Sequence, residues 1–89
     1  MIDAKVGRYT LEKDIEDLRA AKCMIVATSI LPGYGYLIFW YDKQGYSVTE
    51  RRGGARGEKS SSVSGALPYK EGLDHYLESI EALADERYH

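Results

Sequence analysis

The sequence has little of several residue types on which common protein classes depend. Its single cysteine, Cys23, excludes an internal disulfide and a multi-cysteine zinc site, and favours a reducing, cytoplasmic compartment. No apolar run approaches the roughly 20 residues that span a membrane, and no apolar segment follows the N-terminus as in a signal peptide. A net charge of −2 excludes a generally basic nucleic-acid coat protein.

Catalytic motifs are missing as well. The sequence contains no Walker loop, HExxH or GxSxG pattern, and Gly33 and Gly35 form a bare GxG that we interpret as part of a turn. His75 falls off the apolar stripe of a predicted helix, and His89 is the last residue. Cys23 begins an apolar strand, where a free thiol usually behaves as a small hydrophobe. We therefore predict that the protein is not an enzyme and uses neither a cofactor nor a metal.

What is present is a set of helical and strand patterns within 89 residues, which is enough for a single domain over 1–89. Residues 1–9 form a polar lead-in, and Thr10 is a candidate N-cap for a helix over roughly 10–21. The apolar stripe of that helix comprises Leu11, Ile15, Leu18 and the stem of Lys22. A second helix begins near Tyr69, and its apolar positions are Leu73, Tyr76, Leu77, Ile80, Leu83 and Ala84.

Between the helices, strands are predicted over 23–30, 36–41 and 46–51, with a weaker edge strand over 60–67. The first of these has apolar residues at both odd and even positions, which favours an interior strand or one covered on both faces. Pro32 and Gly33 suit the central positions of a type II turn. The order predicts an α+β fold, in which an antiparallel β-meander of three or four strands carries an N-terminal and a C-terminal helix.

The predicted hairpin turn sets the register of the second and third strands. A three-residue loop over Asp42–Gly45 places Trp40 opposite Val48. We then expect the C-terminal helix to cover the face of Ile38, Trp40 and Val48 through Leu73, Leu77, Ile80 and Leu83. The face of Leu37, Phe39 and Tyr41 needs cover from the first helix or from a second copy, so a homodimer is expected.

One charged feature is basic. From Lys43 to Lys59, five basic residues face two acidic ones, and 52–60 reads as a flexible, basic Gly/Ser-rich loop with an RGG triplet. Arginine forks on a pliable backbone, beside aromatic rings, suit single-stranded nucleic acid. The candidate nucleic-acid-binding residues are Arg51, Arg52, Arg56, Lys59, Tyr34 and Tyr41. The alternative is a mobile loop whose charges only keep the protein in solution, with the tyrosines in packing roles.

The other charged feature is acidic and lies on the C-terminal helix. Five carboxylates fall within an arc of roughly 80° at 100° per residue, opposite the apolar stripe: Glu71, Asp74, Glu78, Glu81 and Asp85. None has a lysine or arginine four residues later, although such pairs would stabilise a surface helix. This pattern favours a surface for a basic partner, and the alternative is an acidic face that is only solvated.

The leading hypothesis is a small non-enzymatic protein-binding module whose acidic helix face engages a basic surface of a nucleic-acid-handling protein. In size and charge layout the chain resembles small phage and mobile-element inhibitors, among them anti-CRISPR proteins; no motif indicates a family. The alternatives are a small nucleic-acid-binding domain and a structural homo-oligomer. No membrane association is expected.

Overall fold

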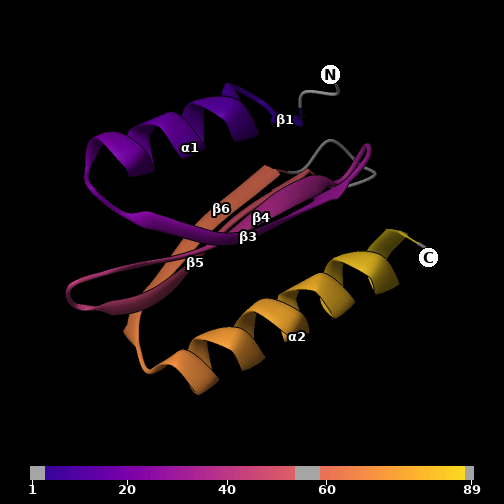
Figure 1. Cartoon of the computed structure of the whole chain (residues 1–89). Helices are drawn as coiled ribbons and strands as arrows, with labels where there is room; N and C mark the ends of the chain where they lie inside the picture. Colours follow the sequence, from indigo (N-terminus) through magenta and orange to yellow (C-terminus); the bar gives the residue numbers. More distant parts are fainter. Residues whose placement is uncertain (1–3, 54–58, 88–89) are drawn as a thin grey trace.

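Figure 1 presents a computed structural model of the chain, which describes residues 4–53 and 59–87. Its main sheet has four antiparallel strands in chain order: β3 (Met24–Leu31), β4 (Gly35–Asp42), β5 (Gly45–Gly53) and β6 (Lys59–Leu67). Helix α1 (Leu11–Ala20) covers one face of this sheet and helix α2 (Tyr69–Arg87) covers the other (Figure 1). The predicted α+β fold is confirmed, including its fourth strand. Neither of the two described helices is long and apolar enough to cross a membrane.

The lead-in predicted for 1–9 has structure that the sequence analysis missed, because Lys5–Thr10 forms a second, two-stranded sheet with its turn. Strands β1 (Lys5–Val6) and β2 (Tyr9–Thr10) pair around a turn in which Gly7 has φ +59°. Val6 is buried and packs, with Ala4, on the face of the main sheet that carries Tyr36. Two residues per strand are too few for an alternation pattern to be visible in the sequence.

Helix α1 begins as predicted and ends one residue earlier. The backbone N–H of Lys13 donates to Oγ1 of Thr10 at 3.2 Å, which confirms the N-cap. At the other end, Cys23 N–H donates to the Leu18 carbonyl and Lys22 N–H to the Arg19 carbonyl, a Schellman motif. Lys22 takes the left-handed position of this motif, with φ +65°, and is exposed. Its predicted place in the apolar stripe is therefore wrong.

The two hairpin turns of the sheet differ in how well the sequence predicted them. The type II turn is confirmed, because Tyr34 N–H donates to the Leu31 carbonyl at 2.9 Å and Gly33 has φ +83°. The second turn is shorter than predicted, and Asp42 pairs directly with Gly45. The Asp42 carboxylate accepts a hydrogen bond from the Gln44 N–H at 2.8 Å, which closes this turn.

That difference of one residue moves the side chains of β5 to the opposite face from the one predicted. Trp40 pairs with Ser47, and Val48 pairs with Phe39. Helix α2 therefore packs on the face of Leu37, Phe39 and Val48, contrary to our prediction that it covers Ile38 and Trp40. The buried residues on this side are Leu31, Leu37, Phe39, Val48 and Tyr76. Half-buried Leu73, Ile80 and Ala84 complete the contact from the helix.

Two features of α2 differ from the predicted apolar stripe. Leu77 is 49% exposed rather than buried, and Leu83 has a side chain outside the described part of the structure. Gly72 is buried instead, and a Cβ built there would lie 3.0 Å from the Tyr46 Cβ and 3.1 Å from the Phe39 ring. The absence of a side chain at Gly72 thus lets the first turns of α2 approach the sheet closely.

Helix α1 and the β1–β2 hairpin cover the other face, where Tyr36 and Ile38 are fully buried. Half-buried Leu11, Ile15 and Leu18 pack on them from the helix. Because α2 already covers Leu37 and Phe39, the uncovered face from which we expected a homodimer does not exist. Strand β3 is also not an interior strand. It lies at the edge of the sheet, with Met24, Val26 and Ile30 exposed.

Candidate functional site

The five carboxylates predicted on the C-terminal helix, which we call the acidic face, are all exposed on α2: Glu71, Asp74, Glu78, Glu81 and Asp85. The opposite side of the helix is fixed by the burial of Gly72, Tyr76 and Ser79. From the first to the last acidic residue the face extends about 21 Å, at 1.5 Å per residue. The packing of α2 thus directs the whole array to solvent.

These carboxylates form no ion pair with any of the residues that the structure describes. Helix α1 differs, because Lys13 and Asp17 form an ion pair at 3.3 Å, four residues apart. Unpaired like charges on one helix face cost a few tenths of a kcal/mol each. Apart from Glu71, which lies in the first turn where a carboxylate stabilises a helix, the acidic face does not stabilise α2, and its carboxylate oxygens are accessible to a cationic partner.

An apolar side chain that sequence reasoning placed in the core borders the acidic face. Leu77 lies between Asp74 and Glu81 on the helix surface, three residues after one and four before the other. Its 49% exposure adds an apolar contact point beside the carboxylates. Phosphate groups offer nothing for such a contact, whereas a protein surface does.

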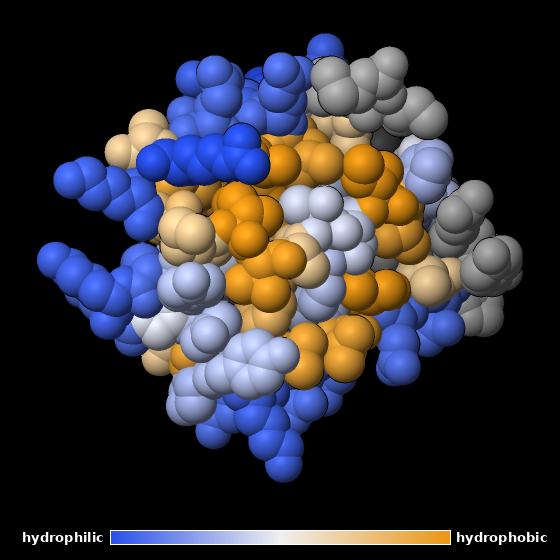
Figure 2. Space-filling model, viewed as in Figure 1, coloured by the Kyte–Doolittle hydropathy of each residue, from blue (hydrophilic) through white to orange (hydrophobic). Residues whose placement is uncertain are grey.

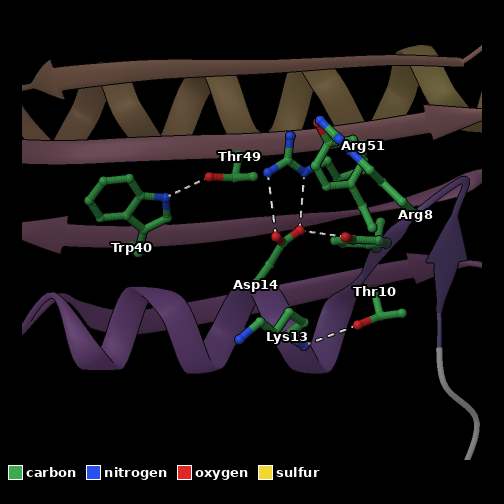
Figure 3. A network of polar contacts seen from close by, with 9 residues as sticks. Arg8, Thr10, Lys13, Asp14, Trp40, Thr49 and Arg51 are labelled. Atoms are coloured by element: carbon green, nitrogen blue, oxygen red, sulfur yellow. Dashed lines mark hydrogen bonds and ion pairs between the residues drawn. The ribbon is translucent and has the colours of Figure 1, made fainter.

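A second polar cluster lies inside the molecule, between α1 and the sheet (Figure 3). Asp14 projects from α1, and its two oxygens accept hydrogen bonds from Arg51 Nε at 3.1 Å and from Arg51 Nη2 at 3.4 Å. The Tyr36 hydroxyl donates to the same carboxylate. The Arg51 guanidinium also stacks on Tyr9, 4.0 Å from the ring centroid. The cluster thus joins α1, β2, β4 and β5.

Burial decides the electrostatics of this cluster. It raises the pKa of Tyr36 far above its usual value, and the hydrogen bond to Asp14 and the charge of that carboxylate add to the shift. Burial alone would lower the pKa of Arg51, but the hydrogen bonds and charge of Asp14 outweigh it, and the net shift is upward. The cluster therefore holds an ionised arginine and a protonated tyrosine on one carboxylate. Such an arrangement is structural, because each polar group is already satisfied.

Replacement of Tyr36 by phenylalanine is expected to reduce the free energy of unfolding by about 2 kcal/mol near pH 8, because a hydrogen bond to a charged group is lost. The difference from wild type should shrink above pH 10. There the unfolded tyrosine, with its ordinary pKa of 10.0, ionises, while the folded one stays protonated. Urea unfolding of both proteins between pH 8 and 11 measures this. A difference that grows with pH would contradict the protonated state of Tyr36.

The structure separates the residues of the predicted nucleic-acid site. Arg51 is held by Asp14, with its side chain only 16% exposed, and it faces α1. Arg52, the next residue on β5, faces the side of α2, because neighbouring strand residues alternate between faces. Arg56 lies outside the described residues, as does the side chain of Lys59.

Four residues of the loop predicted over 52–60 lie in strands instead. Arg52 and Gly53 belong to β5, Lys59 and Ser60 belong to β6, and residues 54–58 lie outside the described part. The two predicted stacking tyrosines also have packing roles. Tyr34 is half-buried against the α2 side of the core, and Tyr41 packs against Tyr46 with ring centroids 5.1 Å apart.

The structure describes the surroundings of two side chains that the sequence analysis weighed for catalysis, His75 and Cys23. Nε2 of His75 lies 3.1 Å from Oγ of Ser64, which ties α2 to β6 rather than leaving the imidazole solvated. Burial raises the pKa of the Cys23 thiol, with a further contribution from the charge of Asp42, so the reactive thiolate is disfavoured. Among the described residues, no three His, Cys, Asp or Glu side chains are grouped closely enough to hold a metal ion.

Sequence reasoning missed Asp14, although a signal for it was present. Asp14 follows Leu11 by three residues and precedes Leu18 by four, so it lies within the apolar stripe of α1. A carboxylate at such a position requires a buried partner, and Arg51 supplies it.

No family model matches this chain, and neither a curated protein nor a solved structure is significantly similar to it.

Proposed function

We propose that the protein is a non-enzymatic protein-binding module, and that the acidic face of α2 is its contact surface for a basic partner. The observation that carries this proposal is that all five carboxylates on one face are exposed, without ion pairs among the described residues. Leu77, exposed beside them, favours a protein partner over nucleic acid. The single buried thiol of Cys23 suits action in the cytoplasm.

The chemistry of such a surface points to the kind of partner. A row of carboxylates about 21 Å long matches a basic groove that otherwise tracks a phosphate backbone. Occupation of that groove excludes nucleic acid, and the module then acts as an inhibitor of a nucleic-acid-handling protein. Because each exposed ion pair contributes at most about 1 kcal/mol, the carboxylates act as an array that steers the encounter.

Reversal of two carboxylates, Glu78→Lys with Glu81→Lys, tests the proposal. Affinity capture from cells of the source or of its target recovers the partner with the wild-type protein, and binding kinetics are then measured with purified components. We expect about ten-fold weaker binding, mostly through slower association, because charge acts before contact. The effect should shrink above about 0.15 M salt, where the Debye length is about 8 Å.

The matched control is Glu16→Lys with Asp17→Lys on α1, which changes the net charge from −2 to +2 in the same way. It also removes the Lys13–Asp17 ion pair, which is exposed and contributes at most about 1 kcal/mol to stability. Both control positions are exposed and lie across the sheet from α2. Equal loss of binding in the two variants would show that net charge alone matters and would refute the acidic face as the site. A mobility-shift assay with single- and double-stranded oligonucleotides completes the test. A shift that becomes stronger in the α2 variant would favour the nucleic-acid hypothesis instead.

A further inference from the structure

The edge of the main sheet formed by β3 is uncovered. Among the described residues no strand pairs with the outer side of β3. Exposed sheet edges in natural proteins are usually protected by charged residues, proline or bulges, because a free edge accepts another strand. Between Met24 and Leu31 the strand has neither a charge nor a proline. Its one irregularity is a bulge between Ile25 and Ala27, which leaves the following residues regular.

Apolar side chains gather along this edge. Met24, Val26 and Ile30 are 55%, 45% and 39% exposed. Figure 2 shows an apolar band across the middle of the molecule, between hydrophilic surfaces at the level of α1 and α2.

The other edge of the sheet has a different character. Strand β6 carries four serines and a lysine among its nine residues, and Ala66 interrupts its extended backbone with φ +59°. One of its side chains, Val63, is a large exposed hydrophobic residue. The two edges therefore differ in how readily they accept a further strand, and β3 is the receptive one.

We propose that a second copy of this chain pairs with β3, antiparallel and about a twofold axis near Thr28, so that the two sheets become one of eight strands. In this arrangement Ala27 of one copy faces Ser29 of the other, and Ile30 lies beside Val26 of the second copy. Pairs of small side chains next to apolar pairs suit a close strand–strand contact.

Charge complementarity favours a second copy over an unrelated strand. Helix α1 leads directly into β3, so its C-terminal end lies near the start of that strand. Asp14 points towards β5, and the helical period places Glu12 and Arg19 on the opposite flank of α1, towards the β3 edge. An antiparallel twofold then brings Arg19 of each copy towards Glu12 of the other. The same chain supplies both the apolar strand and the matching charges.

Sedimentation equilibrium of the purified protein tests the proposal. At about 100 µM we expect a mass of twice 10.0 kDa. Val26→Lys with Ile30→Lys should raise the dissociation constant of the dimer by at least about 100-fold, because the twofold axis brings the new like charges together. The matched control is Val63→Lys on β6, whose side chain is more exposed, at 58%, and which should leave the dimer intact. A charge reversal, Arg19→Glu, should weaken the dimer by about five-fold, and Glu12→Lys in the same chain should restore it.

A second variant locates the axis. In a Cys23→Ala background, Thr28→Cys should form an intermolecular disulfide under mild oxidation, because the two positions face each other across the twofold. Val63→Cys, in the same background, should not. A wild-type protein that remains a monomer at this concentration would overturn the proposal, as would a dimer that survives the two lysines on β3. Neither result bears on the acidic face, because no residue of that face takes part in the strand pairing.

Discussion

Replacement of Gly35 by alanine is expected to remove about 4 kcal/mol or more from the free energy of unfolding, a value reserved for severe steric conflicts. A Cβ at Gly35 would lie 2.1 Å from the carbonyl oxygen of Arg51, an atom of the backbone of β5. Gly35 is paired on both sides, with Leu31 of β3 and with Arg52 of β5, so its backbone has little room to move away from that oxygen. The total free energy of unfolding of a domain of this size is about 5–13 kcal/mol. The loss should therefore be visible as a large fall in the urea concentration at the unfolding midpoint.

Gly33→Ala, two residues earlier and in the turn that precedes β4, is the matched control. Gly33 has a left-handed backbone with φ +83°, but a Cβ there would meet nothing within 4 Å. Its replacement should therefore cost only the backbone strain, about 1–2 kcal/mol. If both alanine variants unfold at the same urea concentration, the close approach of β4 and β5 at Gly35 is refuted.

Asp14→Ala is expected to destabilise the protein by about 3–5 kcal/mol, because it leaves the Arg51 guanidinium buried without its counter-charge. The carboxylate is the common acceptor for Arg51 and Tyr36, so both donors lose their partner at once. Thermal and urea unfolding measure the loss. Far-ultraviolet circular dichroism at low temperature checks that the remaining fold is retained.

The double change Asp14→Leu with Arg51→Met distinguishes two contributions to the free energy of unfolding. One is the stabilisation by the ion pair itself, and the other is the destabilisation by a buried Arg51 charge without its partner. Apolar side chains of similar size often replace a buried ion pair without loss of stability. We therefore expect the double variant to be more stable than Asp14→Ala by at least about 2 kcal/mol. A double variant as unstable as the single one would mean that the cluster positions α1 through its hydrogen bonds, rather than only satisfying buried charges.

Local features of the fold were predictable, because the interactions that cause them lie within a few residues. Thr10 caps α1 through the N–H of Lys13, three residues later. Pro32 and Gly33 form the predicted type II turn through a hydrogen bond between Leu31 and Tyr34. The acidic face of α2 followed from the helical period alone, and its exposure agrees with that prediction. In each case the residues that cause the feature lie within a few positions or one helical repeat of each other, so the sequence pattern alone is enough to predict it.

Other features depended on contacts between distant residues, and the sequence pattern left them open. Strand β4 has apolar residues at both odd and even positions, so both of its faces look buried. The sequence pattern therefore could not tell which helix covers Phe39 and which covers Ile38. One residue in the turn at Asp42 decides the answer by moving Val48 to the face of Phe39. The apolar run of β3 was compatible with an interior strand, and only the order of the sheet places it at an edge.

By itself, the sequence determined the element types, their order and the separation of basic from acidic segments, because propensity, periodicity and charge are local properties. The tertiary structure decided which residues meet. It brought Asp14 to Arg51, 37 residues later, and so removed a predicted phosphate-binding residue from the surface. It also placed the apolar strand β3 at a sheet edge, where none of the described strands pairs with its outer side. Contacts of this range depend on strand register and helix placement, which the packing of the whole chain selects among patterns that are locally equivalent.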